Sequence, residues 1–304
     1  MYASARTSLG LVREINQDCH LVWELSSHGR TALQVSFCIV ADGMGGGAAG
    51  DRASSLAVQA ASESVAQGVF QRTTEVTSKA FDALSLLHGA VDAANHAVKA
   101  DADQHPSREG MGTTLTAGLM SAGVMFISHV GDSRCYRLRG GVLRQLTEDH
   151  SLVGEMVRLG HLSGEDARRH PRRNIITRAL GLHDEIAVEM VCDVVEEHDL
   201  YLFCSDGLWG SVADSQIREI LQRPSAFGGT RGRLAIDAAA DRLVQLALDA
   251  GGEDNITVLI GRVEACDIHQ EAATIARSVH DAGVCAAREP AGEWKRTLRY
   301  RPPE

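Results

Sequence analysis

Short runs of apolar, often branched residues recur along the chain. Three of them read as single strands, residues 33–40, 199–205 and 255–263. Two longer stretches, 113–130 and 133–147, each divide around a turn that contains Gly, which is typical of β-hairpins. The pattern therefore predicts a largely antiparallel set of strands.

Segments of helical periodicity lie between these strands. Residues 51–67 are rich in Ala and Ser, and residues 79–102 and 233–250 carry apolar residues at the spacing of one helix face. Hairpins combined with a few long helices predict an α+β fold in which helices are layered on antiparallel sheet.

Two segments differ from the rest of the chain. Residues 147–180 are polar and Arg-rich, with RRHPRR at 168–173, and predict a small helical flap inserted between strands. Residues 264–304 follow the last strand. Their spacing of Ile and Val allows one short amphipathic helix, Ile268 to Val279, before a Pro-containing loose tail. We therefore expect one domain over 1–263 with this flap, and an extension over 264–304.

Composition excludes several functions. The 304 residues carry a formal net charge of −10, which disfavours a nucleic-acid partner because phosphate contacts need a basic face. None of the three lysines lies in a phosphate-binding P-loop. The seven cysteines show neither C-x-x-C nor a C-x5-R phosphatase loop, so we expect reduced thiols. No stretch resembles a signal peptide or a membrane span, and we expect a cytoplasmic protein.

Five aspartates occupy unusual places in this pattern. Asp42 and Asp206 each follow a predicted strand and precede Gly, Asp132 follows another strand, Asp254 precedes the last strand, and Asp18 lies near the start. Carboxylates on rigid strand ends can converge only if something offsets their repulsion, and hard divalent cations prefer such all-oxygen ligands. Spacing alone leaves ordinary Asp-Gly turns as an open alternative.

Longer motifs give these aspartates a family context. In order they are GLVR with NQD (10–18), VADGMGG (40–46), GMGTTL (110–115), HVGDSRCYRLRGG (129–141), LTEDHSLV (146–153), NIITRALG (174–181), FCSDGLW (203–209) and EDNITV (253–258). This series, over about residues 7–263, resembles bacterial metal-dependent Ser/Thr protein phosphatases of type 2C. The resemblance implies a four-layer α-β-β-α sandwich, with two antiparallel sheets between helices.

The resemblance also implies roles for single residues. Asp42 would bridge two cations, Mn²⁺ or Mg²⁺, and the Gly43 carbonyl would help to hold one of them. Asp206 and Asp254 would hold the other cation, and Asp132 with Asp206 a weaker third ion.

Two further residues take roles outside direct cation binding. Asp18 would act mainly through metal-bound water, and Arg13 would grip the substrate phosphate. The chain departs from some family members at Gln17, where they have Glu, and at Met44, where they have His. The second departure leaves the general acid unidentified.

The implied reaction is hydrolysis of phosphoserine and phosphothreonine by direct attack of a metal-bridging hydroxide. The implied partners are phosphorylated proteins and a bacterial Ser/Thr kinase whose action the enzyme reverses, and we expect a monomer. Arg172 and Arg173 of the flap could steer phosphopeptides, or the flap could be a solvated loop. We expect His129 to pack or hydrogen-bond rather than to ligate a metal.

Three other classes remain as alternatives. A haloacid-dehalogenase-like phosphatase needs D-x-D, which neither Asp42 nor Asp206 provides. A non-catalytic signalling module on the same fold should have lost metal ligands, which are all present here. A Ca²⁺-binding structural protein would need repeated acidic loops, and the chain has none.

Overall fold

The computed structural model of the 304-residue chain describes residues 1–27, 33–46, 49–74, 82–225 and 229–264. The short helix predicted in the C-terminal extension lies outside these residues. Among the described helices none is long and apolar enough to cross a membrane.

Two antiparallel sheets form the centre of the molecule. The first has the order β1 (Tyr2–Ser8), β11 (Ile256–Arg262), β10 (Leu200–Cys204), β7 (Arg134–Arg139) and β8 (Val142–Gln145). The second has the order β2 (Asp18–Ser27), β3 (Leu33–Met44), β5 (Leu115–Ser121), β6 (Val124–Val130) and β9 (Glu189–Val194), and the two-residue β4 (Gly112–Thr113) pairs with the end of β3.

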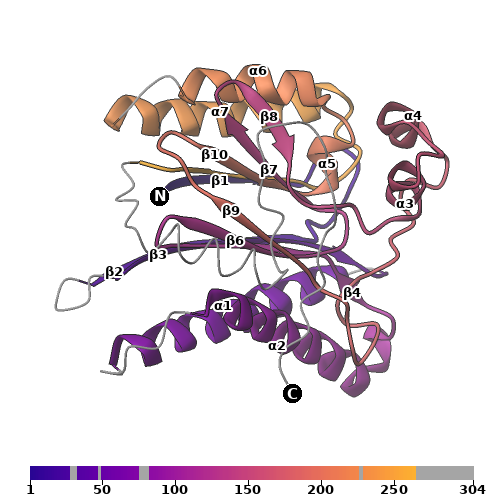
Figure 1. The fold of residues 1–304 in the computed structure, drawn as a ribbon. Coiled ribbons are helices and arrows are strands. Elements are labelled where there is room, and N and C mark those ends of the chain that lie inside the picture. The colour runs from indigo at the N-terminus through magenta and orange to yellow at the C-terminus, as the bar shows by residue number, and fades with distance from the viewer. Residues whose placement is uncertain (28–32, 47–48, 75–81, 226–228, 265–304) are drawn as a thin grey trace.

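Helices cover the outer face of each sheet. Helices α1 (Ala49–Thr74) and α2 (Ala83–Gln104), followed by the single turn η1 (Pro106–Arg108), lie against the second sheet. Helices α6 (Asp214–Ser225) and α7 (Gly229–Asp249) lie against the first (Figure 1). The predicted α-β-β-α sandwich is thereby confirmed.

Buried side chains from both sheets fill the space between them. Cys38 and Met125 of the second sheet meet Cys135, Tyr201 and Phe203 of the first in one apolar cluster. Because β5, β6, β10 and β11 are buried throughout, their sequences are largely apolar, which made these strands predictable. The buried thiols Cys38 and Cys135 agree with the expected reduced cysteines.

Several elements, among them β1, β2, β9 and α6, were not predicted from the sequence. Strands β1, β2 and β9 lie at sheet edges, and helix α6 contributes Ile217 and Leu221 to the core. Strand β1 is mostly half-buried, so it carries polar residues and lacks the apolar run that identifies a central strand.

The Arg-rich segment does form two short helices between β8 and β9. They are α3 (Leu152–Arg158) and α4 (Gly164–Arg169), and each begins with a serine, Ser151 or Ser163, whose hydroxyl accepts a backbone N–H of the first turn. Both helices project at the end of the sandwich where α5 (Asp206–Trp209) follows β10 (Figure 1).

The close approach of the sheets at Gly118 gives a stability prediction. A Cβ at Gly118 would lie 2.5 Å from Phe203 and 3.1 Å from the sulfur of Cys38, so Gly118→Ala should destabilise the fold by about 1–3 kcal/mol. Urea unfolding measures this change. The control is Gly89→Ala on the open face of α2, where a Cβ meets nothing within 4 Å and should stabilise the helix by about 0.5–1 kcal/mol. Equal effects of the two substitutions would contradict the prediction.

Candidate metal centre

The five aspartates come together at one end of the sandwich. Asp18 begins β2 directly opposite Asp42 on β3, so the strand register alone makes them neighbours. Asp206 follows β10 and Asp254 precedes the adjacent β11, and Asp132 lies in the loop that joins β6 of one sheet to β7 of the other. Electrostatic interactions link Asp42 to each of the other four.

The backbone at Asp42 is held by two threonines. The Asp42 N–H donates to the Thr114 hydroxyl at 2.9 Å, while the Thr114 N–H and the Thr113 hydroxyl both donate to the Asp42 carbonyl at 2.8 Å. At Gly43 a Cβ would meet the Gly50 carbonyl at 2.0 Å. This position therefore requires glycine, and the chain direction after Asp42 is fixed.

Asp18 is held from the opposite sheet. The Ser205 hydroxyl donates to Asp18 Oδ2 at 2.7 Å and accepts the Thr257 N–H at 2.9 Å. The loop before Asp18 is fastened by Asn255, whose side chain accepts from the Gln17 N–H and donates to two carbonyls between residues 9 and 15. Ser205 and Asn255 thus connect the segment that carries Asp18 to segments of the first sheet that are distant in sequence.

The loop of Asp132 is held by Trp209 and by the buried guanidinium of Arg134. Its carbonyl accepts the Trp209 indole N–H at 3.0 Å, and the guanidinium of Arg134 lies 3.7 Å from the centre of the Trp209 ring. Arg134 also forms a two-point ion pair with Asp149 at 2.8 and 2.6 Å. The loop that carries Asp132 is therefore braced by groups from α5 and from the start of the flap segment.

Burial and mutual repulsion disfavour the ionised form of the clustered carboxylates. Burial, and then the neighbouring carboxylates, raise the pKa of Asp42 and of Asp132 well above their usual range. Burial likewise raises the pKa of Asp18 to about 7, and burial followed by Asp254 raises that of Asp206 to about 6.

Three of these carboxylates also have an oxygen that is buried without a hydrogen-bond partner, namely Oδ1 of Asp18, Asp132 and Asp206. Buried acceptors normally find a donor, and clustered acids normally find a counter-charge. Carboxylate oxygens that lack both a hydrogen-bond donor and a counter-charge are suitable ligands for hard divalent cations such as Mn²⁺ and Mg²⁺. The residues present therefore fit the cations that the sequence implied.

Arg13 lies at the rim of this cluster. Its Nη2 is 2.7 Å from Asp254 Oδ2, and the ion pair raises the pKa of the Arg13 guanidinium further. The side chain is 49% exposed, so it can also reach a ligand from solvent. A permanently charged fork beside the carboxylates is suited to hold a phosphate.

The flap arginines divide into different environments. Arg168 is an anchor, because its guanidinium donates to the carbonyls of Trp209 and Val212 and pairs with Asp214. Arg172 is exposed, and Arg173 lies 3.8 Å from Glu253, the neighbour of Asp254.

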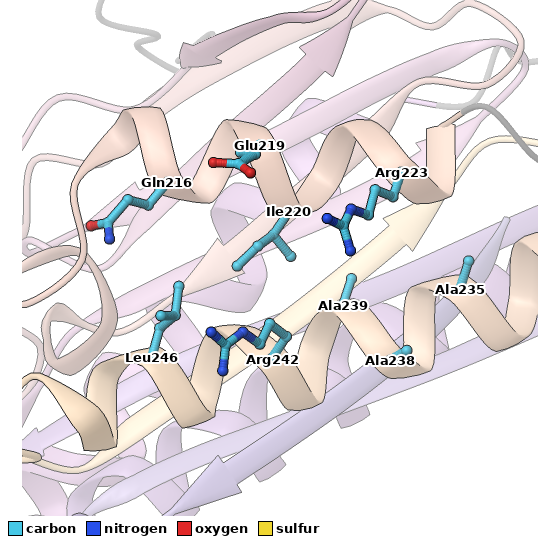
Figure 2. Close-up of a pocket in the computed structure, with 9 residues that line it drawn as sticks. All are labelled: Gln216, Glu219, Ile220, Arg223, Ala235, Ala238, Ala239, Arg242 and Leu246. Atoms are coloured by element: carbon cyan, nitrogen blue, oxygen red, sulfur yellow. The ribbon is translucent and has the colours of Figure 1, made fainter.

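A separate cavity of about 490 Å³ lies between α6 and α7 (Figure 2). Ile220 of α6 faces Ala239 and Leu246 of α7 across it, and Glu219 and Arg223 also line it. None of the five aspartates lines this cavity, so it is not part of the candidate metal centre.

Known proteins are similar to this chain in sequence and in fold. A family model described as Protein phosphatase 2C matches residues 13–227. The serine/threonine phosphatase Stp of Listeria monocytogenes is 38% identical over 260 residues, which cover 86% of this chain and 95% of Stp. The phosphatase PstP of Mycobacterium tuberculosis is 37% identical over 276 residues, which cover 91% of this chain and 48% of PstP.

Solved structures agree with the sequence comparison. A crystal structure of Mycobacterium tuberculosis PstP/Ppp superposes with a TM-score of 0.71 at 37% identity, over 87% of this chain and 99% of that one. A structure of the PstP catalytic domain in complex with two manganese ions gives a TM-score of 0.69 at 36% identity, over 86% and 98% of the two chains.

Fold and site together define a metal-dependent hydrolase built on an α-β-β-α sandwich. The chain belongs to the protein phosphatase 2C family.

Removal of divalent cations should make stability fall as pH rises. The folded protein retains protons on Asp18 and Asp206 that the unfolded chain releases above about pH 4, so stability is lost as pH rises toward 7. Thermal melts of chelated protein should show a stability on the order of 1–3 kcal/mol lower at pH 8 than at pH 5. Asp18→Asn should flatten this slope, as should added Mn²⁺, whereas Asp241→Asn on the exposed face of α7 should not. A flat profile in the chelated wild type would contradict the explanation.

Proposed function

We propose that this protein is a metal-dependent protein serine/threonine phosphatase that removes phosphate from phosphoserine and phosphothreonine in proteins. The observation that supports this most strongly is the convergence of five aspartates, three of which have a buried oxygen without a hydrogen-bond partner, in a chain 38% identical to a named Ser/Thr phosphatase. The phosphatase domain would span residues 1–263 with the flap inserted.

The proposed ligand roles follow the positions of the carboxylates. Asp42, linked to all four other acids, would bridge two cations, with the Gly43 carbonyl on one of them. Asp206 and Asp254 would hold the second cation, and Asp132 with Asp206 a weaker third ion. Asp18, which Ser205 already holds by one oxygen, would contribute through water.

The bound cation pair would supply a water of lowered pKa and offset negative charge on the phosphate. The chain's own part in the reaction is to orient the groups around that centre. Arg13 would grip the phosphate oxygens with its planar fork. The rigid backbone at Asp42, fixed by Thr113 and Thr114, would keep the ligand oxygens in place during turnover.

The setting of the enzyme is also part of the proposal. The substrates would be phosphoproteins made by a cytoplasmic bacterial Ser/Thr kinase, and the phosphatase would act as a monomer in signal transduction. A non-catalytic module is disfavoured, because every carboxylate of the predicted ligand set is retained and lies in one cluster.

Loss of a carboxylate that would hold the cations should nearly abolish hydrolysis. Asp42→Ala and Asp206→Ala should each lower Mn²⁺-dependent p-nitrophenyl phosphate turnover about a thousandfold or more, since cations contribute several kcal/mol to such reactions. The fold should remain intact by circular dichroism, and Asp241→Asn should keep full activity. Retained turnover in Asp42→Ala would refute the assignment.

Flap arginines should affect large substrates more than small ones. If Arg172 and Arg173 steer phosphopeptides, their combined replacement by Ala should raise the phosphopeptide KM about three- to tenfold and leave p-nitrophenyl phosphate unchanged. Arg168 must stay intact because it anchors the flap. Arg169→Ala is the matched control, since Arg169 is 82% exposed and pairs only weakly with Glu165 at 3.5 Å. Equal losses on both substrates would refute selective docking.

A further inference from the structure

A second group of chemically capable side chains lies beside the metal centre. His129, His150 and Glu189 are buried, and one ligand atom of each lies within 4.8 Å of the others. Such a set can bind a transition metal, but here the ring nitrogens are already engaged. His129 contacts the Thr116 hydroxyl at 2.9 Å and the Glu148 carbonyl at 3.0 Å, and the Arg178 guanidinium lies 3.1 Å from His150. A fixed positive charge at this point opposes a further cation.

His150 makes an unusual set of contacts with the residue before Asp132. The backbone N–H of Gly131 donates to the ring nitrogen Nδ1 of His150 at 3.1 Å. The backbone N–H of His150 donates to the Gly131 carbonyl at 2.7 Å. Gly131 has a φ of +110°, and a Cβ there would lie 2.5 Å from Thr114. Gly131 is thus enclosed between Thr114, which fixes Asp42, and His150.

The same residue begins the flap. The His150 carbonyl accepts the Thr177 N–H at 2.8 Å, and Leu152 N–H donates to the Ile175 carbonyl at 2.9 Å, so the two ends of the flap segment pair as a short stem. His150 therefore contacts the flap stem with its carbonyl and the Asp132 loop with its ring and its N–H.

The direction of the Gly131 N–H decides the role of His150 Nδ1. A backbone N–H cannot rotate away, so Nδ1 must be the acceptor, while Nε2 lies 3.1 Å from Arg178 Nη1 and 3.4 Å from Glu189 Oε2. Burial, followed by the charge of Arg178, lowers the pKa of His150 to about 4 and keeps the ring neutral. The acceptor at Nδ1 is therefore available throughout the neutral range.

We propose that His150 is a positioning residue. It would hold the Asp132 loop in the conformation that binds the weaker third cation, and it would fix the flap stem to that loop. This inference rests on the proposed function, since it concerns the third cation of the same centre. Without the acceptor, the buried Gly131 N–H is left unsatisfied, and a backbone turn at positive φ is free to shift.

Two amide substitutions separate positioning from general packing. In His150→Asn the side-chain oxygen can occupy the place of Nδ1 and accept from Gly131, whereas in His150→Gln the amide extends to the place of Nε2 and cannot. Calorimetric titration of Mn²⁺ into purified protein should show the weak site retained in His150→Asn and weakened about tenfold or more in His150→Gln, as expected for loss of one buried hydrogen bond. The two tight sites should remain in both variants.

A double variant tests the route through Asp132. Because Asp132→Asn removes the weak site directly, adding His150→Gln to it should cause no further loss of Mn²⁺ binding. His88→Gln on α2, where the ring contacts Asp92, is the control for replacing a partly buried histidine and should bind Mn²⁺ like the wild type.

The outcomes distinguish this inference from the proposed function. If the wild type binds Mn²⁺ and hydrolyses p-nitrophenyl phosphate but Asn and Gln at position 150 bind the weak cation alike, His150 does not position Asp132. If the wild type binds no Mn²⁺ and shows no hydrolysis, the proposed function itself fails. Weak-site loss confined to the Gln variant supports the inference.

Discussion

The structure depends on holding like charges together. Five carboxylates meet where the two sheets end, and burial raises the pKa of Asp18, Asp42, Asp132 and Asp206. Mutual repulsion would spread these groups apart on a flexible chain. Here the register of β2 and β3 and the close packing between the sheets prevent it. Stability contributed by the core is thus partly used to maintain a site that is unfavourable when empty, which is a common trade between stability and function. The same strain favours cation binding.

Several arginines pair with carboxylates that lie away from the aspartate cluster. On β7 of the first sheet, Arg134 pairs with Asp149, Arg137 with Asp193 of β9 in the second sheet, and Arg139 with Asp199. These acids lie outside the metal centre. The three arginine side chains therefore neutralise other carboxylates, and the five-aspartate cluster stays negatively charged. Arg13 differs from these arginines, since it pairs with Asp254 at the exposed rim. A cation on Asp254 would compete with this pair and leave the guanidinium available to a phosphate. Part of the formal net charge of −10 is therefore concentrated in one place.

Sequence reasoning predicted the centre of the fold better than its edges. Strands buried on both faces show as apolar runs, but β1, β2 and β9 are edge strands and lack that signal. Asp42 and Asp206 were identifiable because each lies between a strand and Gly. Asp18 had only a short motif, and its position becomes clear from its pairing with Asp42. The supporting roles of Ser205, Asn255 and Trp209 could not be predicted, because each depends on contacts between segments that are 77–246 residues apart.

The flap segment is anchored at two points, which limits what it can do. Arg168 fixes α4 to the segment around Trp209, and His150 fixes the stem to the loop of Asp132. Trp209 in turn donates to the Asp132 carbonyl, so both anchors act on the same aspartate. If Asp132 holds a weaker third cation, as proposed above, a ligand that shifts the flap would change the energy of that site. By linkage, a cation bound there would change the affinity of the flap for that ligand by the same factor. Under this proposal, two short chains of hydrogen bonds rather than a hinge would connect substrate contact at the flap to cation binding.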